Sequence, residues 1–230
     1  MNMTNHTPQA PHLEPGFFTD EEMADIYLAV NNTMDKGVKD AQDKWHYFKK
    51  NTNNGFNVIF FSERRQGELP GLSQKVEDKL RLKLEEKAKG PVGHVGVLWA
   101  RYTLESGDIP SLMPHQDRSE THVAYMCTVE LDSNIDWNFY VGDEEFEMKK
   151  NQAVWFSGTN QPHWRPDYDF KEGDYYDILL FQTHAEDDDN PLSEDHYDEG
   201  DEIGNEYSTK YAHLLKNSIA KAQMSDGRCQ

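Results

Sequence analysis

The chain has 230 residues, of which 36% are hydrophobic and 12% aromatic, enough apolar side chains for one substantial core. Its formal net charge of −19 repels phosphate backbones and no basic stripe offsets it, so we expect no nucleic-acid partner. The apolar runs are far shorter than a membrane span requires, and residues 1–10 lack the apolar region of a signal peptide. At this length we expect a single domain over residues 1–230. With only two cysteines we expect no structural disulfide, and the reducing cytoplasm is the expected setting.

Two helices are predicted in the first part of the chain. Thr19 and Glu22 form a capping box, and an apolar 3.6-residue period follows it as far as Gly37. Residues 56–61 are typical of a strand, and a second helix is predicted over residues 73–89, ended by Gly90-Pro91. The apolar stripe of this second helix consists of Val76, Leu80 and Leu84.

The middle of the chain has β-forming residues at short, regular spacing with turn residues between them. The predicted strands span residues 94–102, 121–131, 137–141, 144–148, 153–156 and 178–183. This pattern is typical of an antiparallel barrel or sandwich. The predicted fold class is therefore mostly β with supporting helices.

Two segments follow the last predicted strand. Residues 186–202 form an acidic, turn-rich block that we expect to loop through solvent. Residues 206–222 predict an amphipathic helix, which could pack on the barrel or against a second subunit. The sequence leaves that choice and the oligomeric state open.

The motif His115-Gln116-Asp117 and the later His163 have the composition of a metal site. In an extended segment, residues i and i+2 project to the same side, so His115 and Asp117 can bind one ion together. Two imidazoles and one carboxylate on one face of an octahedral ion leave three positions open, as in non-haem Fe(II) oxygenases. With ten histidines and 42 acidic residues a chance His-x-Asp is possible, but the surrounding strands favour the metal site.

The order of these features resembles a known family. A strand with Arg101-Tyr102, the His115-x-Asp117 motif, two or three strands, a Trp/Phe strand and turn, and then His163 is similar to the Fe(II)/2-oxoglutarate dioxygenases, most of all their prolyl-hydroxylase-type branch. The resemblance covers about residues 15–182. It implies a double-stranded β-helix, a jelly-roll or cupin-like barrel. In that family a tyrosine placed like Tyr102 helps to hold 2-oxoglutarate.

The resemblance also implies a reaction. Fe(II), the cosubstrate 2-oxoglutarate and O2 together would hydroxylate a C–H bond, with succinate as the coproduct. A peptidyl side chain of prolyl type is the first substrate class to expect, and a free amino acid the second.

The chain departs from the family at the cosubstrate anchor. The family usually supplies Arg or Lys about nine or ten residues after the distal histidine, where this chain has Glu172 and Gly173. A carboxylate in a buried pocket needs a cationic partner, so another base must substitute. Arg165 is the first candidate, because an extended His163-Trp164-Arg165 would point Arg165 to the side of His163, and its planar fork suits a carboxylate.

Two weaker candidates for the anchor remain. Lys171 lies in a polar turn, where a solvated lysine is the usual finding. Arg101 alternates with Tyr102 and would normally face the opposite side.

Other functions stay open on the sequence. A cupin-like protein could bind a metal without oxygen chemistry, and a metal oxygenase could work without 2-oxoglutarate. The sequence contains no phosphate-binding glycine loop, dinucleotide fingerprint, CxxC pair or Gly-x-Ser-x-Gly elbow. Some further side chains could line the cavity, although a structural role is more usual for each: His122, Tyr125, Trp155 and Trp164. His184 ends the predicted strand over residues 178–183, where a solvated role is the default.

Overall fold

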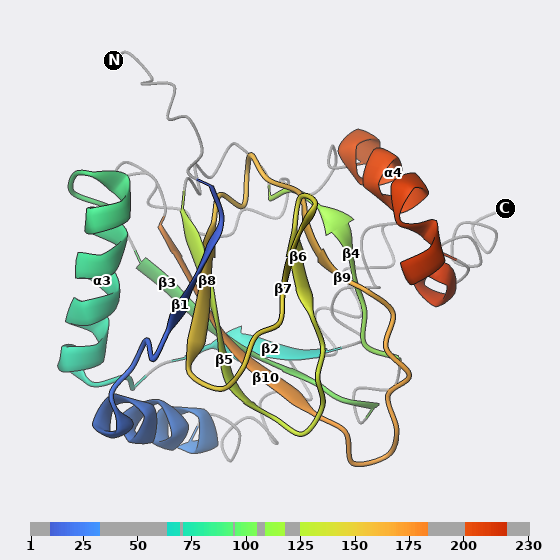
Figure 1. Cartoon of the computed structure of the whole chain (residues 1–230). Helices are drawn as coiled ribbons and strands as arrows, with labels where there is room; N and C mark the ends of the chain where they lie inside the picture. The colour runs from blue at the N-terminus through green and yellow to red at the C-terminus, as the bar shows by residue number, and fades with distance from the viewer. Residues whose placement is uncertain are drawn as a thin grey trace, which may run out of the picture.

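The structure is a computed structural model of the chain. It describes residues 10–32, 64–69, 71–93, 95–104, 109–117, 125–183 and 201–219, with the backbone alone for 64–68 and 201–205. Within these ranges ten β-strands form two antiparallel sheets, with helices on the outside (Figure 1). The predicted fold class is confirmed, but the two sheets stay separate and do not close into a hydrogen-bonded barrel.

The larger sheet has six strands in the order β1-β8-β5-β10-β3-β2. Their bounds are His12–Pro15 for β1, Gln152–Phe156 for β8, Met126–Ser133 for β5, Tyr176–Thr183 for β10, Val95–Tyr102 for β3 and Arg64–Glu68 for β2. The smaller sheet has the order β4-β9-β6-β7, with bounds Leu112–His115, His163–Arg165, Phe139–Val141 and Glu144–Phe146. Strands far apart in sequence are therefore neighbours in both sheets.

The space between the sheets is filled by side chains from both of them. One apolar cluster joins Met126, Val154 and Phe156 of the large sheet to Phe139 and Val141 of the small one. Alternation along each strand decides which residues enter this interior, because successive side chains point to opposite faces. On β5, Cys127, Val129 and Leu131 face outward into the core under the helices, so Met126, Thr128 and Glu130 face inward.

Two helices cover the outer face of the large sheet (Figure 1). The first spans residues 20–32, and its capping box is confirmed: the Thr19 N–H donates to Glu22 Oε2 at 2.9 Å, and the Glu22 N–H donates to Thr19 Oγ1 at 3.3 Å. The second, α3, spans Gln74–Ala88 and buries the predicted stripe of Val76, Leu80 and Leu84. It ends with Lys89 in the left-handed conformation, one residue before the predicted stop.

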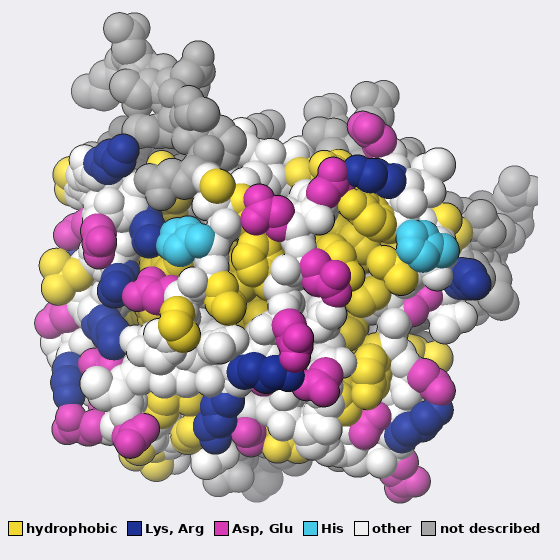
Figure 2. All heavy atoms as spheres, viewed as in Figure 1, with side chains coloured by type: hydrophobic (Ala, Val, Ile, Leu, Met, Phe, Trp, Pro, Cys, Tyr) yellow, Lys and Arg dark blue, Asp and Glu magenta, His cyan; other side chains and the backbone are white. Residues whose placement is uncertain are grey.

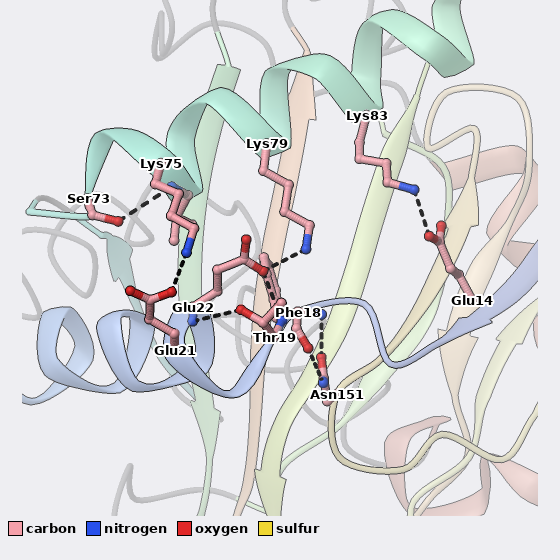
Figure 3. A network of polar contacts seen from close by, with 11 residues as sticks. Glu14, Phe18, Thr19, Glu21, Glu22, Ser73, Lys75, Lys79, Lys83 and Asn151 are labelled. Atoms are coloured by element: carbon pink, nitrogen blue, oxygen red, sulfur yellow. Dashed lines mark hydrogen bonds and ion pairs between the residues drawn. The ribbon is translucent and has the colours of Figure 1, made fainter.

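Ion pairs connect α3 to the N-terminal segment of the chain, residues 14–22 (Figure 3). Lysines spaced four residues apart lie on one face of α3, so each meets a different carboxylate. Lys75 pairs with Glu21, Lys79 with Glu22 at 2.6 Å, and Lys83 with Glu14 at 2.8 Å. The N-terminal segment is therefore fixed along the length of the helix.

The C-terminal part departs from its prediction of one helix over residues 206–222. Helix α4 spans Asp201–Lys210, a 3-10 helix follows over Ala212–Leu214, and a last turn covers 216–219. The break has a tertiary cause, because the Asp167 carboxylate accepts the backbone N–H groups of Asn217 at 2.5 Å and Ser218 at 3.2 Å, capping a new helical turn. Residues 201–202, expected in the acidic loop, belong to α4.

This C-terminal segment packs on the protein's own small sheet, which settles where its apolar face goes. Tyr140 stacks on Trp164 with ring centroids 4.2 Å apart, and Tyr211 lies 4.7 Å from Trp164. Leu215 is fully buried in the same cluster. Figure 1 shows α4 beside β4 at the edge of this sheet.

Several predictions fall outside the described residues: the strand over 56–61, the stop at Gly37, the loop over 186–200, and His122 and His184. Among the helices that are described, none has the length and apolarity to span a bilayer.

Candidate metal centre

His115, Asp117 and His163 come together at one end of the small sheet. His115 ends β4 and lies directly opposite His163, the first residue of β9, after a register shift in the pairing of the two strands. The candidate ligand atoms of the three side chains all lie within 4.8 Å of one another. Nε2 of His115 is 3.8 Å from Asp117 Oδ1, and Nε2 of His163 is 3.8 Å from Asp117 Oδ2.

Backbone carbonyl groups orient both imidazoles. Nδ1 of His115 lies 2.8 Å from the oxygen of Met113, and Nδ1 of His163 lies 3.2 Å from the oxygen of Gln161. Because a carbonyl oxygen can only accept, each Nδ1 carries a proton, and in the neutral imidazole this leaves on Nε2, on the side of Asp117, the lone pair that can bind a metal ion. This is the tautomer that a metal ion requires.

Asp117 is held from the loop between β8 and β9. Its backbone N–H donates to the carbonyl oxygen of Gly158 at 2.8 Å. A Cβ on Gly158 would lie 2.2 Å from Asp117 Oδ2, so only glycine leaves room for the carboxylate in this position. Sequence reasoning missed Gly158, although the turn Ser157-Gly158 before His163 was visible.

The carboxylate has an unmet requirement that a cation would satisfy. Asp117 Oδ2 is buried and accepts no hydrogen bond from any described residue. A buried, unpaired carboxylate oxygen is costly, whereas two imidazole lone pairs and a carboxylate are a donor set for a divalent transition metal. The residues present therefore fit such an ion.

The site is closed on one side and open on the other. The His163 side chain is 6% exposed, whereas those of His115 and Asp117 are 24% and 29% exposed. The Phe156 ring lies 4.8 Å from that of His163, and Phe139 lies 6.3 Å from it, so both shield the inner side. An ion held here would keep positions accessible to further ligands.

Arg165 lies deeper between the sheets, on the same side of β9 as His163. It is 1% exposed, and its guanidinium carbon is 4.4 Å from the Tyr176 ring and 5.1 Å from the rings of Trp137 and Phe139. Nη1 donates to the Trp137 carbonyl, and Nη2 lies 3.9 Å from Met148 Sδ. It forms no ion pair with a carboxylate in the described ranges.

Glu130 and Tyr176 lie beside Arg165, and the sequence analysis missed both. The Tyr176 hydroxyl donates to Glu130 Oε2 at 2.7 Å, and Ser133 Oγ donates to Oε1 at 2.9 Å. Burial raises the pKa of Glu130, more than these hydrogen bonds and the Arg165 charge lower it. Burial also raises the pKa of Tyr176. The alternation of side chains along a strand, which predicts that Arg165 and His163 share a side of β9, also predicts that Glu130 shares the inward face of β5 with Met126.

The other anchor candidates lie in different places. Tyr102 is 1% exposed and packs edge-to-face on Trp137 at 5.0 Å, in the aromatic layer that surrounds Arg165. Lys171 is exposed and pairs with Asp169, so the structure does not bring it to the centre. Arg101 forms two hydrogen bonds to Asp177, at 2.7 and 2.5 Å, and is occupied there.

The three aromatic candidates for the cavity wall belong to the outer packing layers. Trp155 and Tyr125 lie in the core under the helices, and Trp155 is 5.3 Å from Phe181. Trp164 is covered by the C-terminal segment. The more usual role for such residues, as core, is confirmed.

No protein-family model matches the sequence, and no curated protein matches it. In structure, the chain is similar to a prolyl hydroxylase from Trichoplax adhaerens, solved in complex with a hypoxia inducible factor oxygen degradation domain peptide fragment. The TM-score is 0.51 at 11% identity, covering 76% of this chain and 84% of that one.

Two further solved structures are similar to the chain with lower TM-scores. A Pseudomonas putida prolyl-4-hydroxylase has a TM-score of 0.48 at 13% identity, covering 76% of this chain and 92% of that one. HygX from Streptomyces hygroscopicus, solved with nickel and 2-oxoglutarate bound, has a TM-score of 0.44 at 12% identity, covering 76% and 82%. With its two facing antiparallel sheets, and on the similarity to the Trichoplax enzyme, the chain has the double-stranded β-helix fold of the prolyl hydroxylases.

Proposed function

We propose that this protein is a non-haem Fe(II)/2-oxoglutarate-dependent oxygenase that hydroxylates a C–H bond. The observation that carries the proposal is the meeting of two oriented imidazoles with a carboxylate whose buried oxygen has no hydrogen-bond partner among the described residues. Bound Fe(II) would supply the activation of O2, with 2-oxoglutarate as the co-reductant.

The protein's own residues would divide the work around that ion. His115 and His163 would bind it through Nε2, while Met113 and Gln161 hold their tautomers. Asp117 would offset one positive charge and complete the face of three ligands. Phe139 and Phe156 would keep water from the inner side of His163.

Arg165 is the proposed anchor for the distal carboxylate of 2-oxoglutarate. It is a buried cation on the inner side of His163, walled by aromatic rings and without an ion pair to any carboxylate that the structure describes. A planar guanidinium binds a carboxylate through two parallel hydrogen bonds.

The substrate class that we propose first is a peptidyl side chain of prolyl type, with a free amino acid second. The Trichoplax neighbour was solved with a peptide, which supports a peptide as the first substrate class to test. The open side of the centre, where His115 and Asp117 are partly exposed, is where such a substrate would approach.

Anaerobic addition of Fe(II) and then 2-oxoglutarate tests the function directly. We expect a weak visible charge-transfer band, followed by succinate formation once O2 is admitted. His163→Ala should lose both signals, and Lys171→Ala is the matched control, because Lys171 is on the surface. Tight iron binding without the band would instead favour a metal-binding protein or an oxygenase with another cosubstrate.

The anchor is tested by titrating 2-oxoglutarate against Arg165→Lys and Arg165→Ala. Arg165→Ala should raise the required 2-oxoglutarate concentration by about one to two orders of magnitude, from the loss of a charged hydrogen bond of about 1.5–3 kcal/mol. Arg165→Lys should restore binding only in part, because a point charge lacks the fork. Iron affinity should scarcely change in either variant, and an unaltered 2-oxoglutarate requirement would remove Arg165 from this role.

A further inference from the structure

The C-terminal segment, residues 206–219, covers the outer face of the two strands that carry the metal ligands (Figure 1). Trp164 follows His163 on β9, so its side chain points away from the interior, because successive residues of a strand face opposite sides. Tyr211 lies 4.7 Å from the Trp164 ring, and Leu215 packs in the same cluster. Trp164 and Leu215 are both fully buried, so each covers part of the other.

The segment also contacts the strand that carries His115. The Met113 side chain on β4 packs against the cluster of Trp164 and Leu215, while the Met113 carbonyl oxygen lies 2.8 Å from His115 Nδ1. Met113 on β4 and Trp164 on β9 therefore connect the C-terminal segment to both metal-binding histidines.

Polar contacts fix the segment over these strands. Asp143, in the turn between β6 and β7, accepts a hydrogen bond from the Tyr211 hydroxyl at 2.6 Å. Asp167, two residues after β9, donates its backbone N–H to the carbonyl oxygen of Leu214 at 2.8 Å. Its carboxylate accepts the backbone N–H of Ser218 at 3.2 Å. The segment is thus attached on both sides of the apolar contact.

β4 and β9 hold the two histidines through a short pairing. It joins Leu112 to Arg165 and His115 to His163, with an irregularity between the two pairs. β4 is also the edge strand of the small sheet, so within the described sheet it has a neighbouring strand on one side only. Metal ligands must be held within about 0.5 Å of their working positions, which needs packing around them as well as backbone pairing. The C-terminal segment supplies the outer part of that packing.

We infer that the C-terminal segment positions His115 and His163 from the outer face, so that its docking and metal binding strengthen each other. This rests on the proposed function, because it needs an ion between the two histidines. The ion joins β4 to β9 from the inside, and the segment joins the same strands from the outside. Each stabilises the arrangement that the other requires, and the coupling is reciprocal. Tyr211 and Leu215 are positioning residues, since they act through Trp164 and Met113.

Leu215→Ala and Leu84→Ala form a matched pair, because both remove a fully buried leucine, one under the C-terminal segment and one under α3. Isothermal titration with Co(II) should show an affinity about tenfold or more weaker in Leu215→Ala and unchanged in Leu84→Ala. Leu215→Met, which nearly conserves the volume, should bind Co(II) like the wild type. If Leu215→Ala does not fold, Tyr211→Ala makes the same test against Tyr211→Phe, which keeps the ring on Trp164.

Hydrogen exchange measures the reverse effect. The backbone N–H groups of Tyr211, Leu214, Leu215 and Ile219 donate within the segment, and without denaturant they exchange through its local opening. Co(II) should slow their exchange in the wild type and should have no effect in His163→Ala, which lacks a metal ligand.

Wild-type Co(II) affinity in Leu215→Ala, with faster exchange in its C-terminal segment, would overturn the coupling and leave the proposed function in place. An equal loss of affinity in Leu84→Ala would also overturn it, since the loss would then come from general destabilisation. Unchanged exchange in the Co(II)-loaded wild type would contradict the reciprocal effect. If the wild type binds no Co(II), the proposed metal centre fails first, and the coupling fails with it.

Discussion

At the scale of single residues, the position of the Asp117 carboxylate requires that residue 158 has no Cβ. A Cβ at Gly158 would lie 2.2 Å from Asp117 Oδ2 and 2.1 Å from Met126 Sδ. The thioether is the end of a flexible side chain and can move aside. The carboxylate cannot move without leaving the two histidines, because its backbone is held by the Gly158 carbonyl.

Gly158→Ala should therefore weaken metal binding by about 10–100-fold, the usual effect of disturbing the groups that support a metal ligand. Isothermal titration with Fe(II) or Co(II) measures this. Adding Met126→Ala to Gly158→Ala should not restore affinity, since it relieves only the contact with sulfur. Gly90→Ala is the matched control, because a Cβ there meets nothing within 4 Å. Wild-type affinity in Gly158→Ala would show that Asp117 is not positioned by this glycine.

At the scale of elements, α3 stabilises the protein through one face and touches solvent with the other. Leu84 is fully buried in the core between α3 and the large sheet, whereas Leu82 on the same helix is 64% exposed. The same residue type therefore occurs in two environments two positions apart. Helix propensity is equal for both, so any difference between their substitutions reports burial alone.

Leu84→Ala should lower the free energy of unfolding by about 2–5 kcal/mol, because it leaves a cavity in a packed core. Leu82→Ala should change it by no more than about 0.5 kcal/mol. Urea denaturation of the two variants beside the wild type checks both values. Equal losses would mean that α3 does not pack on the sheet through the stripe of Val76, Leu80 and Leu84.

At the scale of the whole molecule, charge is spread and paired. On the face shown in Figure 2, basic and acidic side chains are interspersed over α3, in keeping with the ion pairs of Lys75, Lys79 and Lys83. The excess of acidic residues still leaves a net charge of −19. Individual carboxyl groups nevertheless differ in their surroundings, so we expect them to change the stability in different directions as the pH changes.

Glu22 and Glu130 should contribute to the pH dependence of unfolding with opposite signs. Burial alone would raise the pKa of Glu22, but hydrogen bonds from Lys79 and Thr19 outweigh it and lower the pKa below 4.5. Its contribution is present above pH 4.5 and is lost as the pH falls through the lowered value. Burial raises the pKa of Glu130 above 4.5, so its effect on stability is favourable at low pH and is lost as the pH rises through the raised value.

Urea denaturation from about pH 3 to about pH 7 tests these signs. Glu22→Gln should make the free energy of unfolding fall less steeply as the pH is lowered. Glu130→Gln should remove the loss of stability that the ionisation of Glu130 causes as the pH rises. Glu21→Gln is the control for Glu22, because Glu21 is 77% exposed and an exposed ion pair contributes little. A steeper acid limb in Glu22→Gln would contradict the sign.

The sequence by itself determined the features that depend on neighbours a few residues away. The capping box at Thr19 and Glu22, the stripe on α3 and the inward direction of both His163 and Arg165 follow from the fixed periods of helices and strands. Local periodicity also placed most of the strands correctly. These features are predictable because backbone geometry alone decides which side chains share a face.

The tertiary structure decided everything that depends on partners distant along the chain. Asp167 ends the predicted C-terminal helix by capping Ser218, 51 residues away, and Gly158 makes room for Asp117 from another loop. The candidate anchors Arg165 and Lys171 were both cations near His163 in sequence, but only Arg165 lies between the sheets. The physical reason is that burial and hydrogen-bond partners are set by the packing of the two sheets, which no local period records.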